Sequence, residues 1–275
     1  MTDRATLEAI VRRFVSDAAA GAGIAEAALA LAALDRPQVA LDRYARHLDT
    51  LSEQVRSAAA DAPLGIAGRA SALSRVLAGV HGYVGDRLTY DDPQNANLMR
   101  VIDRRKGLPV ALGILYMHAA RAQGWQIDGL SFPGHFLVRL ADRGERAILD
   151  PFDGGVERTP GELLAILRRS EGEAATLAPR HYEAVSDRDV LVRLQNNIKL
   201  RLIRDDRITD ALAVVERMLM LAPDDSRLWR EAGLMHVHLG QQRAALTALR
   251  QALELGVPDR HDVAALIERL RTKLH

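Results

Sequence analysis

Residues 132–155 read Phe-Pro-Gly-His-Phe-Leu-Val-Arg-Leu-Ala-Asp-Arg-Gly-Glu-Arg-Ala-Ile-Leu-Asp-Pro-Phe-Asp-Gly-Gly, and the pattern within this stretch decides the fold. Apolar side chains alternate with their neighbours at Phe136, Val138 and Leu140, which is the two-residue period of a half-buried strand. A polar turn around residues 142–145 follows, and a second apolar run covers residues 147–149. The stretch therefore predicts a β-hairpin.

His135 and Asp150 stand at the two open ends of this hairpin. If the turn centres near Asp142 and Arg143, the two residues come opposite each other, where same-face neighbours lie about 5 Å apart. A carboxylate at that distance can orient an imidazole and tune it as a general base. The alternative interpretation of His135 is a structural histidine with satisfied hydrogen bonds. A metal site would need His118 as a third, scattered ligand, so no metal is expected.

A helix upstream gives the hairpin its packing partner. Pro109 in the first turn and Gly124 just past the end bracket residues 110–123. These residues leave no polar face over three turns, which predicts a helix buried nearly all round. His118 lies about two turns into this helix, and it is interpreted as a core residue or as a contact to the hairpin. Free amides at the helix N-terminus would favour an anionic ligand or an activated nucleophile.

The segments before this helix divide into helices and one loop. Apolar residues recur at helical spacing through residues 5–82, with Pro37 opening the third helix. Residues 85–97 break that pattern with a run rich in Asp, Asn, Gly and Pro, which is typical of a structured loop. Its side chains are interpreted as caps and turn formers, and a binding role for Tyr90, Asp92 or Asn95 is the alternative.

The C-terminal part repeats itself. Ala211-Leu212 recurs as Ala245-Leu246, 34 residues later, and the small residues around them are close to the tetratricopeptide pattern of paired helices. The repeat predicts helix pairs at 190–221 and 226–255 and a final helix at 261–274.

The domain prediction follows from this repeat and from the composition before it. Residues 179–187 are polar and unpatterned, and they are interpreted as a linker. We expect one domain over residues 1–180, which holds the N-terminal helices and the hairpin core. The repeat region with its terminal helix then occupies residues 189–275.

Composition excludes several functions. Lys plus Arg total 37 against 36 Asp plus Glu in 275 residues, so no global field attracts nucleic acid or an anionic membrane. The basic clusters Arg104-Arg105-Lys106 and Arg168-Arg169 lack interleaved aromatics and are interpreted as solvated surface. The sequence contains no cysteine, which excludes disulfides, thiolate metal sites and a cysteine nucleophile.

Two further expectations follow from the sequence. A phosphate-binding Gly-Lys-Ser/Thr loop and a His-Glu-x-x-His motif do not occur in the sequence, so no cofactor is expected. The N-terminus carries acid and leads into an amphipathic helix, and no uncharged run is long enough to cross a bilayer. These features predict a soluble, cytoplasmic protein.

Four motifs in order resemble the SirB-type transglutaminase-like family. They are Tyr90–Leu98, Asp103–Val110, Pro133–Val138 and Asp150–Gly155. The resemblance covers residues from about 1 to 255, since that family also joins N-terminal helices and a transglutaminase-like core to C-terminal tetratricopeptide repeats. It implies a mostly helical α+β fold in which a buried helix meets a small antiparallel sheet, as in papain-like proteins.

The resemblance also implies a triad with one member missing. In active relatives, a cysteine at the N-terminus of the buried helix is activated by a histidine and an aspartate, and His135 and Asp150 match those two. The nucleophile position falls within Pro109, Val110 and Ala111, none of which can form a covalent intermediate. Loss of a triad nucleophile can cost about six orders of magnitude in turnover.

The expected function is therefore a non-catalytic protein-binding or scaffolding protein, a pseudoenzyme that uses the repeats and the remnant cleft as contact surfaces. The residues expected to bind at the cleft are Tyr90, Asp92, Asn95, Arg105 and Pro109. The alternative is a hydrolase or transferase in which the His135–Asp150 dyad activates water or a hydroxyl without a cysteine. A protein partner is expected, without nucleic acid or membrane, and the sequence predicts no particular oligomeric state.

Overall fold

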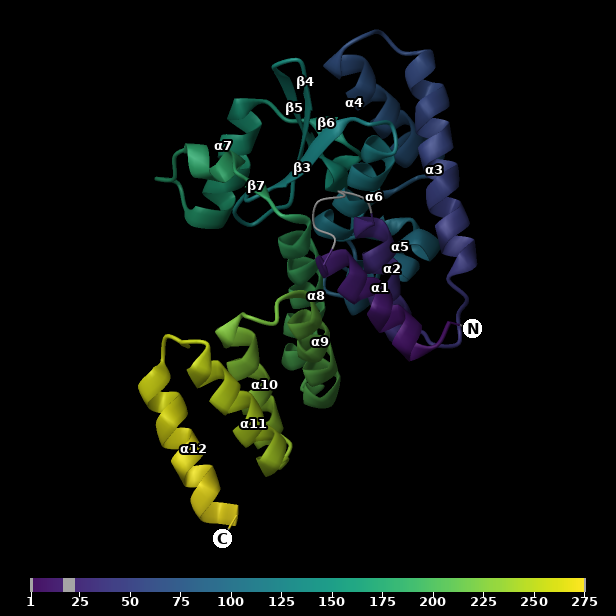
Figure 1. Ribbon diagram of the computed structural model, residues 1–275. Helices are drawn as coiled ribbons and strands as arrows, with labels where there is room; N and C mark the ends of the chain where they lie inside the picture. Colours follow the sequence, from purple (N-terminus) through teal and green to yellow (C-terminus); the bar gives the residue numbers. More distant parts are fainter. Residues whose placement is uncertain (1, 17–22, 275) are drawn as a thin grey trace. The chain divides into compact units, whose positions relative to one another are not determined.

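The structure is a computed structural model that describes residues 2–16 and 23–274, and it divides into units covering residues 1–191 and 192–275 (Figure 1). The first unit combines helices with a small antiparallel sheet, and the second is helical. The mostly helical α+β fold expected from the sequence is confirmed. Within the described residues, no helix is both long enough and apolar enough to cross a membrane.

The first unit begins with helices α1 (Arg4–Ser16), α2 (Ile24–Leu34), α3 (Asp42–Ala60) and α4 (Ile66–Ser74), and α4 continues as a π-helical turn over Arg75–Val80. Residues 17–22, which were expected to be helical, lie outside the described residues. The third helix begins at Asp42 and not at Pro37, because residues 37–41 form turns and a bend before the amphipathic stripe starts.

The sheet has the strand order β6-β5-β4-β3-β7, and each neighbouring pair is antiparallel. Its strands are β3 (Gln126–Leu130), β4 (Val138–Asp142), β5 (Glu145–Asp150), β6 (Val156–Glu157) and β7 (Ala184–Val185). The predicted hairpin is β4–β5, but its turn centres one residue later than expected, on Arg143 and Gly144 at φ 47° and 92°. Two consecutive positive φ values suit a two-residue turn between twisted strands.

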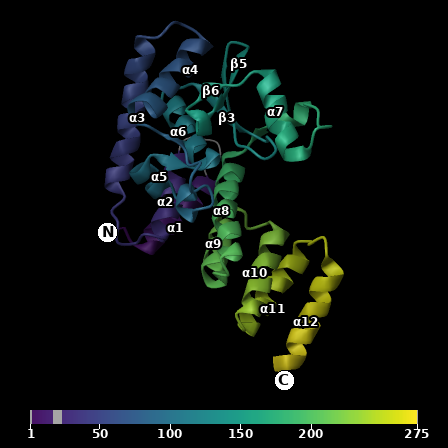
Figure 2. The ribbon, with the colours of Figure 1, turned by 180° about the vertical axis from the view of Figure 1, so that it is seen from behind.

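Helices cover both faces of this sheet (Figures 1 and 2). Helix α6 (Pro109–Arg121) packs with α4 against one face, and its side chains are buried nearly all round, as the sequence predicted. Helix α7 (Pro160–Glu171) covers the other face through Leu163 and Leu167. A capping box at Thr159 starts α7, since its hydroxyl accepts from Glu162 N and the Glu162 carboxylate accepts from Thr159 N.

Short elements connect these layers. A parallel pair of two-residue strands, β1 (Val84–Gly85) and β2 (Lys106–Gly107), encloses a 3₁₀ turn at Pro93–Ala96 and helix α5 (Leu98–Arg104). A second 3₁₀ turn, Pro151–Asp153, follows β5. The expected linker over residues 179–187 is instead ordered as a 3₁₀ turn, Pro179–Tyr182, and strand β7 at the sheet edge. Its polar composition did not reveal the two backbone pairings to β3.

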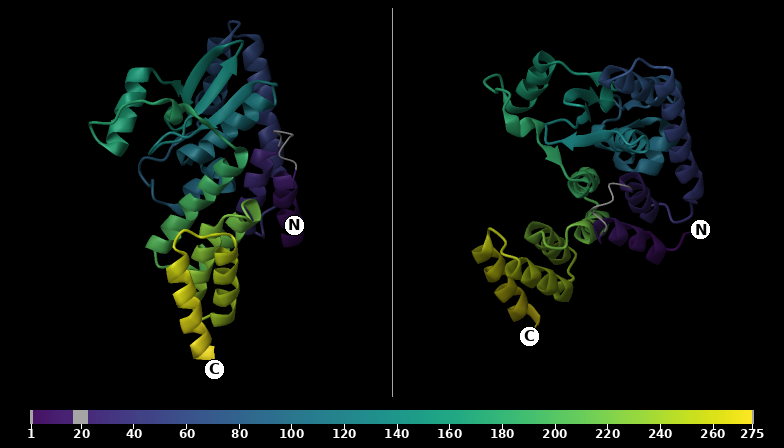
Figure 3. Two further views of the ribbon diagram at one scale, coloured as in Figure 1. Left: turned by 60° about the vertical axis from the view of Figure 1, so that its left-hand side comes forward. Right: turned by 45° about the horizontal axis from the view of Figure 1, so that its top comes forward.

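The second unit consists of helix pairs, as the repeat predicted. Helix α8 (Asp187–Arg204) begins before the boundary at residue 191 and ends in the second unit. It is followed along the chain by α9 (Ile208–Leu221), α10 (Ser226–His238), α11 (Gln242–Glu254) and α12 (Arg260–Leu274) (Figure 3). Helices α10 and α11 approach closely at Gly233, where an added Cβ would lie 2.6 Å from the Leu249 side chain. The small residues of the sequence pattern therefore mark helix contacts.

Candidate functional site

The structure brings His135 and Asp150 together. The Nε2 atom of His135 lies 2.9 Å from Oδ1 of Asp150. Asp150 ends β5, whereas His135 lies in the turn three residues before β4 and not on the strand itself. The side chain of Asp150 is 3% exposed and that of His135 is 18% exposed. The pair therefore has a buried carboxylate and an imidazole that reaches toward the surface.

Asp150 also binds groups other than His135. Its Oδ2 atom accepts from Arg158 Nε at 3.2 Å and Nη2 at 2.9 Å, and Oδ1 accepts from the backbone N of Phe152 at 3.1 Å. Burial raises the pKa of Asp150, but the hydrogen bonds from His135 and Arg158 outweigh burial and hold the pKa below its usual value. Arg158 also binds Asp153 at 2.6 Å. Asp150 is thus a fully hydrogen-bonded carboxylate paired with a guanidinium.

A pocket of about 530 Å³ opens beside the pair. Its lining comes from the loop after β1, the turn before β4, the end of β5 with the 3₁₀ turn that follows it, the segment between β6 and α7, and the last turns of α7. Three guanidinium groups, Arg87, Arg158 and Arg169, face it together with the two carboxylates of Asp150 and Asp153. Sequence reasoning missed all three arginines, because the 3₁₀ turn and α7 bring them together over up to 82 positions of the chain. We name this site the dyad pocket.

The first turn of α6, where the family resemblance places a nucleophile, is buried and apolar. Pro109, Val110 and Ala111 are all buried, and the two latter side chains are 2% and 0% exposed. The backbone N of Leu108, just before this turn, donates to the carbonyl of Asn95 at 2.8 Å. The position is therefore enclosed by the neighbouring loop.

The predicted binding residues have diverse surroundings. Asp92 caps the 3₁₀ turn by accepting from Gln94 N, and Asn95 is fully buried, where its amide donates to Thr89 O at 2.6 Å. Pro109 starts α6 as its first residue. Tyr90 is 43% exposed, and its ring packs edge-on against Phe152, with ring centroids 5.9 Å apart. Of these four, Tyr90 lies beside a residue that lines the dyad pocket.

Arg105 belongs to a separate cluster. It ends α5 in the left-handed conformation at φ 61°, and its guanidinium contacts His47 and the ring and hydroxyl of Tyr83. Burial, together with the nearby charges of Arg105 and His81, lowers the pKa of His47 to about 4. The cluster is therefore held with a neutral His47 at neutral pH, and Arg105 does not line the dyad pocket.

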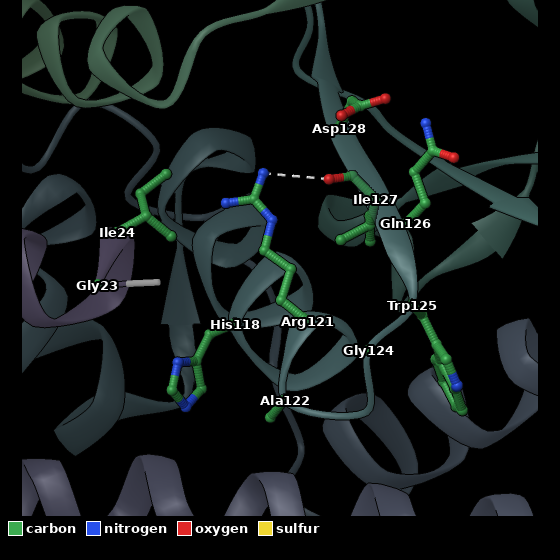
Figure 4. A pocket seen from close by; sticks show the side chains of 10 residues that line it. All are labelled: Gly23, Ile24, His118, Arg121, Ala122, Gly124, Trp125, Gln126, Ile127 and Asp128. Carbon is green, nitrogen blue, oxygen red and sulfur yellow. Dashed lines mark hydrogen bonds between the residues drawn. The ribbon is translucent and has the colours of Figure 1, made fainter. Parts of the chain in front are cut away.

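A second pocket, of about 600 Å³, lies at the far end of α6 (Figure 4). Its cation, Arg121, donates to the carbonyl of Ile127 at 3.1 Å and is paired with the carboxylate of Asp187. His118 also lines it and lies 3.2 Å from Ser52 Oγ, so it contacts α3 and not the hairpin. Because Arg121 is already neutralised, this pocket offers less charge to a ligand than the dyad pocket does.

No metal cluster accompanies these sites in the residues that the structure describes. In that part of the chain, no three or more His, Asp or Glu side chains are grouped so that they could hold a metal ion. His135 and Asp150 have no third ligand of this kind beside them.

These features define a small antiparallel sheet with a buried helix and a His–Asp pair, followed by helix repeats. Comparison with known proteins agrees: the model of the transglutaminase-like superfamily matches residues 42–196, and a tetratricopeptide-repeat model matches residues 198–271. The chain belongs to the transglutaminase-like superfamily and carries a tetratricopeptide-repeat region after that domain.

Relatives extend this finding. The chain is 34% identical over 196 residues to a UPF0162 protein of Xylella fastidiosa, covering 70% of this chain and 69% of that one. A UPF0162 protein of Vibrio cholerae is 34% identical over 174 residues, covering 63% and 64%. Human F-box only protein 21 is 28% identical over 181 residues, which cover 62% of this chain but 28% of the human protein. Among solved structures, menin superposes with a TM-score of 0.41 at 9% identity, over 93% of this chain and 70% of menin.

Proposed function

We propose that this protein is a non-catalytic, cytoplasmic protein-binding protein that uses the dyad pocket and the repeat region as its contact surfaces. The observation that carries the proposal is the first turn of α6, where Pro109, Val110 and Ala111 are buried and offer no nucleophile. Covalent acyl transfer needs a thiolate, a hydroxyl or a comparable group at that place. The four sequence motifs support the narrower assignment to the SirB type as part of the same proposal.

The chemistry of Asp150 supports a binding role. In a dyad that serves a general base, the carboxylate acts mainly on its imidazole and stabilises the positive charge that develops there. Here Asp150 is already paired with the guanidinium of Arg158 through two hydrogen bonds. That pairing reduces the electrostatic support that Asp150 gives to a protonated His135.

A second candidate function rests on the pocket itself. His135 lines an open volume of about 530 Å³, so it could activate water or a substrate hydroxyl without a covalent intermediate. This candidate is a hydrolase or transferase that uses the His135–Asp150 dyad.

One experiment separates the two. The full chain and its His135→Ala variant are incubated with a glutamine-containing peptide and a fluorescent primary amine, and amide exchange and hydrolysis are followed by mass spectrometry. In parallel, both proteins are immobilised and the proteins that they retain from a cell extract are quantified. The proposal predicts stoichiometric retention of a partner and no turnover that depends on His135. Turnover that disappears with His135→Ala would overturn it in favour of the second candidate.

A further inference from the structure

We propose that the dyad pocket binds a carboxylate of an acidic peptide segment, with Arg169 as the receiving cation and Leu88 as the contact for an adjacent apolar side chain. The proposal rests on the proposed function, because it names the chemistry of the partner that the pocket accepts.

Arg169 is the cation available to a ligand. Arg158 is bound to Asp150, Asp153 and Glu162, and Arg87 pairs with Asp153 at 3.1 Å. Among the residues that the structure describes, none forms a hydrogen bond or ion pair with the side chain of Arg169. A guanidinium presents paired N–H donors that match the two oxygens of a carboxylate. An incoming anion can therefore bind Arg169 without displacing an internal partner.

The charged groups of the pocket favour a ligand that carries a single negative charge. Among the residues that line the pocket, three guanidinium groups face two carboxylates, so the cations outnumber the carboxylates by one. A carboxylate neutralises that excess. A phosphate carries close to two negative charges at neutral pH, and it would leave a net negative charge beside Asp150 and Asp153. The arrangement therefore favours a carboxylate over a phosphate.

The pocket is also shaped before a ligand arrives. Gly134 adopts φ +68° and approaches the last turn of α7 so closely that an added Cβ would lie 2.3 Å from Ser170 Oγ. This approach fixes the end of α7, which carries Arg169, against the turn that carries His135. Groups held in place before binding lose little conformational entropy on binding.

The loop on the rim presents apolar surface from a rigid base. Asp86 is 3% exposed, and its carboxylate accepts from the backbone N of Leu88 at 3.1 Å, from Thr89 and from the guanidinium of Arg104. Despite this buried framework, the side chain of Leu88 is 88% exposed. Leu88 directly follows Arg87, which lines the pocket. A leucine presented by a fixed loop can contact an apolar side chain of a partner with little loss of conformational entropy.

The sequence offers a matched pair of variants for the test. Arg168 and Arg169 are adjacent exposed residues at the end of the same helix, but Arg168 does not line the pocket and its Nε atom points to Ala175 O at 3.4 Å. Arg169→Glu and Arg168→Glu change the net charge of the chain equally. The difference between their effects on peptide binding therefore reports the contact in the pocket and not the long-range electrostatic field.

The probe is the capped peptide acetyl-Gly-Leu-Glu-Leu-Gly-amide with a fluorescent label, titrated with the full chain at low salt by anisotropy. Peptides with glutamine or phosphoserine in place of glutamate are the comparison arms. We expect the glutamate peptide to bind about tenfold more tightly than the glutamine peptide, which corresponds to one well-placed charge pair. Arg169→Glu should remove this preference and Arg168→Glu should retain it, whereas Asp153→Asn should strengthen binding of the glutamate peptide.

Three results would overturn the inference: equal binding of the glutamate and glutamine peptides, no binding of either, or an equal effect of Arg168→Glu and Arg169→Glu. Tighter binding of the phosphoserine peptide would reject the carboxylate in favour of a phosphopeptide. These failures leave the proposed function standing if the immobilised chain still retains a partner and shows no His135-dependent turnover. Failure of the proposed function would instead appear as that turnover.

Discussion

The hydrogen-bond network around Asp150 leads to a quantitative prediction about stability. Asp150→Ala removes the acceptor for His135 Nε2, Phe152 N and two nitrogens of Arg158. Removing one partner of a buried ion pair costs about 3–5 kcal/mol. Arg158 keeps its contact to Asp153, so we expect the lower end of that range, about 3 kcal/mol.

His135→Ala should cost less. The interactions that it removes include the hydrogen bond to Asp150 and an edge-on ring contact to Phe152, with centroids 6.0 Å apart, and the side chain is 18% exposed. Such a change corresponds to about 1–2 kcal/mol. If Asp150→Ala lowers the free energy of unfolding more than His135→Ala does, the carboxylate organises the site. If His135→Ala costs more, the fold requires the histidine.

Urea unfolding measures both values. The chain has two tryptophans, Trp125 in the first unit and Trp229 in the second, so a Trp229→Phe background makes the fluorescence report on the first unit alone. Each variant is compared with that background at pH 7, with the m-value checked for constancy. A cost below about 1 kcal/mol for Asp150→Ala, or an equal cost for both variants, would refute the reasoning.

The pH dependence of the same difference provides a control. The pKa of Asp150 is lowered in the folded state, so its stabilising contribution is present above the unfolded value of about 3.9. That contribution is lost as the pH falls through the folded pKa. The difference between Asp150→Ala and its background should therefore shrink below about pH 4, and a constant difference would contradict the assignment.

Three further predictions concern other positions. The pKa of His47 is lowered to about 4 in the folded state, so stability should fall as the pH drops from about 6.5 to 4, and His47→Gln should make this decline shallower in the same urea assay; an unchanged slope would contradict it. Gly134→Ala and Gly144→Ala both place alanine at positive φ, but only the former meets a neighbouring side chain, so it should cost about 1 kcal/mol more in thermal unfolding. Gly233→Ala should destabilise by about 1–3 kcal/mol through contact with α11, whereas Gly161→Ala faces open space on α7 and should stabilise by up to about 1 kcal/mol; calorimetry showing the same sign for both would argue against this packing.

Local signals predicted much of the fold. The alternation of apolar side chains with their neighbours identified the β4–β5 hairpin, and Pro109 and Gly124 marked the two ends of α6. Strands β1, β2, β6 and β7 escaped prediction because each is two residues long, and their backbone pairing to other segments creates no periodicity. Similarly, the third helix begins at Asp42 and not at Pro37, because Pro37 lies in a turn before the helix. A proline in such a turn and a proline in the first turn of a helix look alike in the sequence.

The candidate site was only partly predictable. The pairing of His135 with Asp150 followed from the hairpin, even though His135 lies before the strand. Arg158 and Arg169 could not be found in this way, because their positions depend on the 3₁₀ turn after β5 and on how α7 packs over the sheet. In the sequence, Arg168 and Arg169 are adjacent members of one basic cluster. Only the packing of α7 shows that Arg169, and not Arg168, lines the dyad pocket.

The most direct test of the central claim is the reactivity of a thiol placed where the family resemblance locates a nucleophile. The chain has no cysteine, so Pro109→Cys, Val110→Cys and Ala111→Cys each introduce a single thiol, and Ser170→Cys is an exposed control at the pocket. Iodoacetamide labelling is followed by intact mass. We predict that the three α6 variants react at least about 100-fold more slowly than the control, with no dependence on His135. Fast labelling at pH 6 that is lost on adding His135→Ala would reveal an activated thiolate and contradict the account.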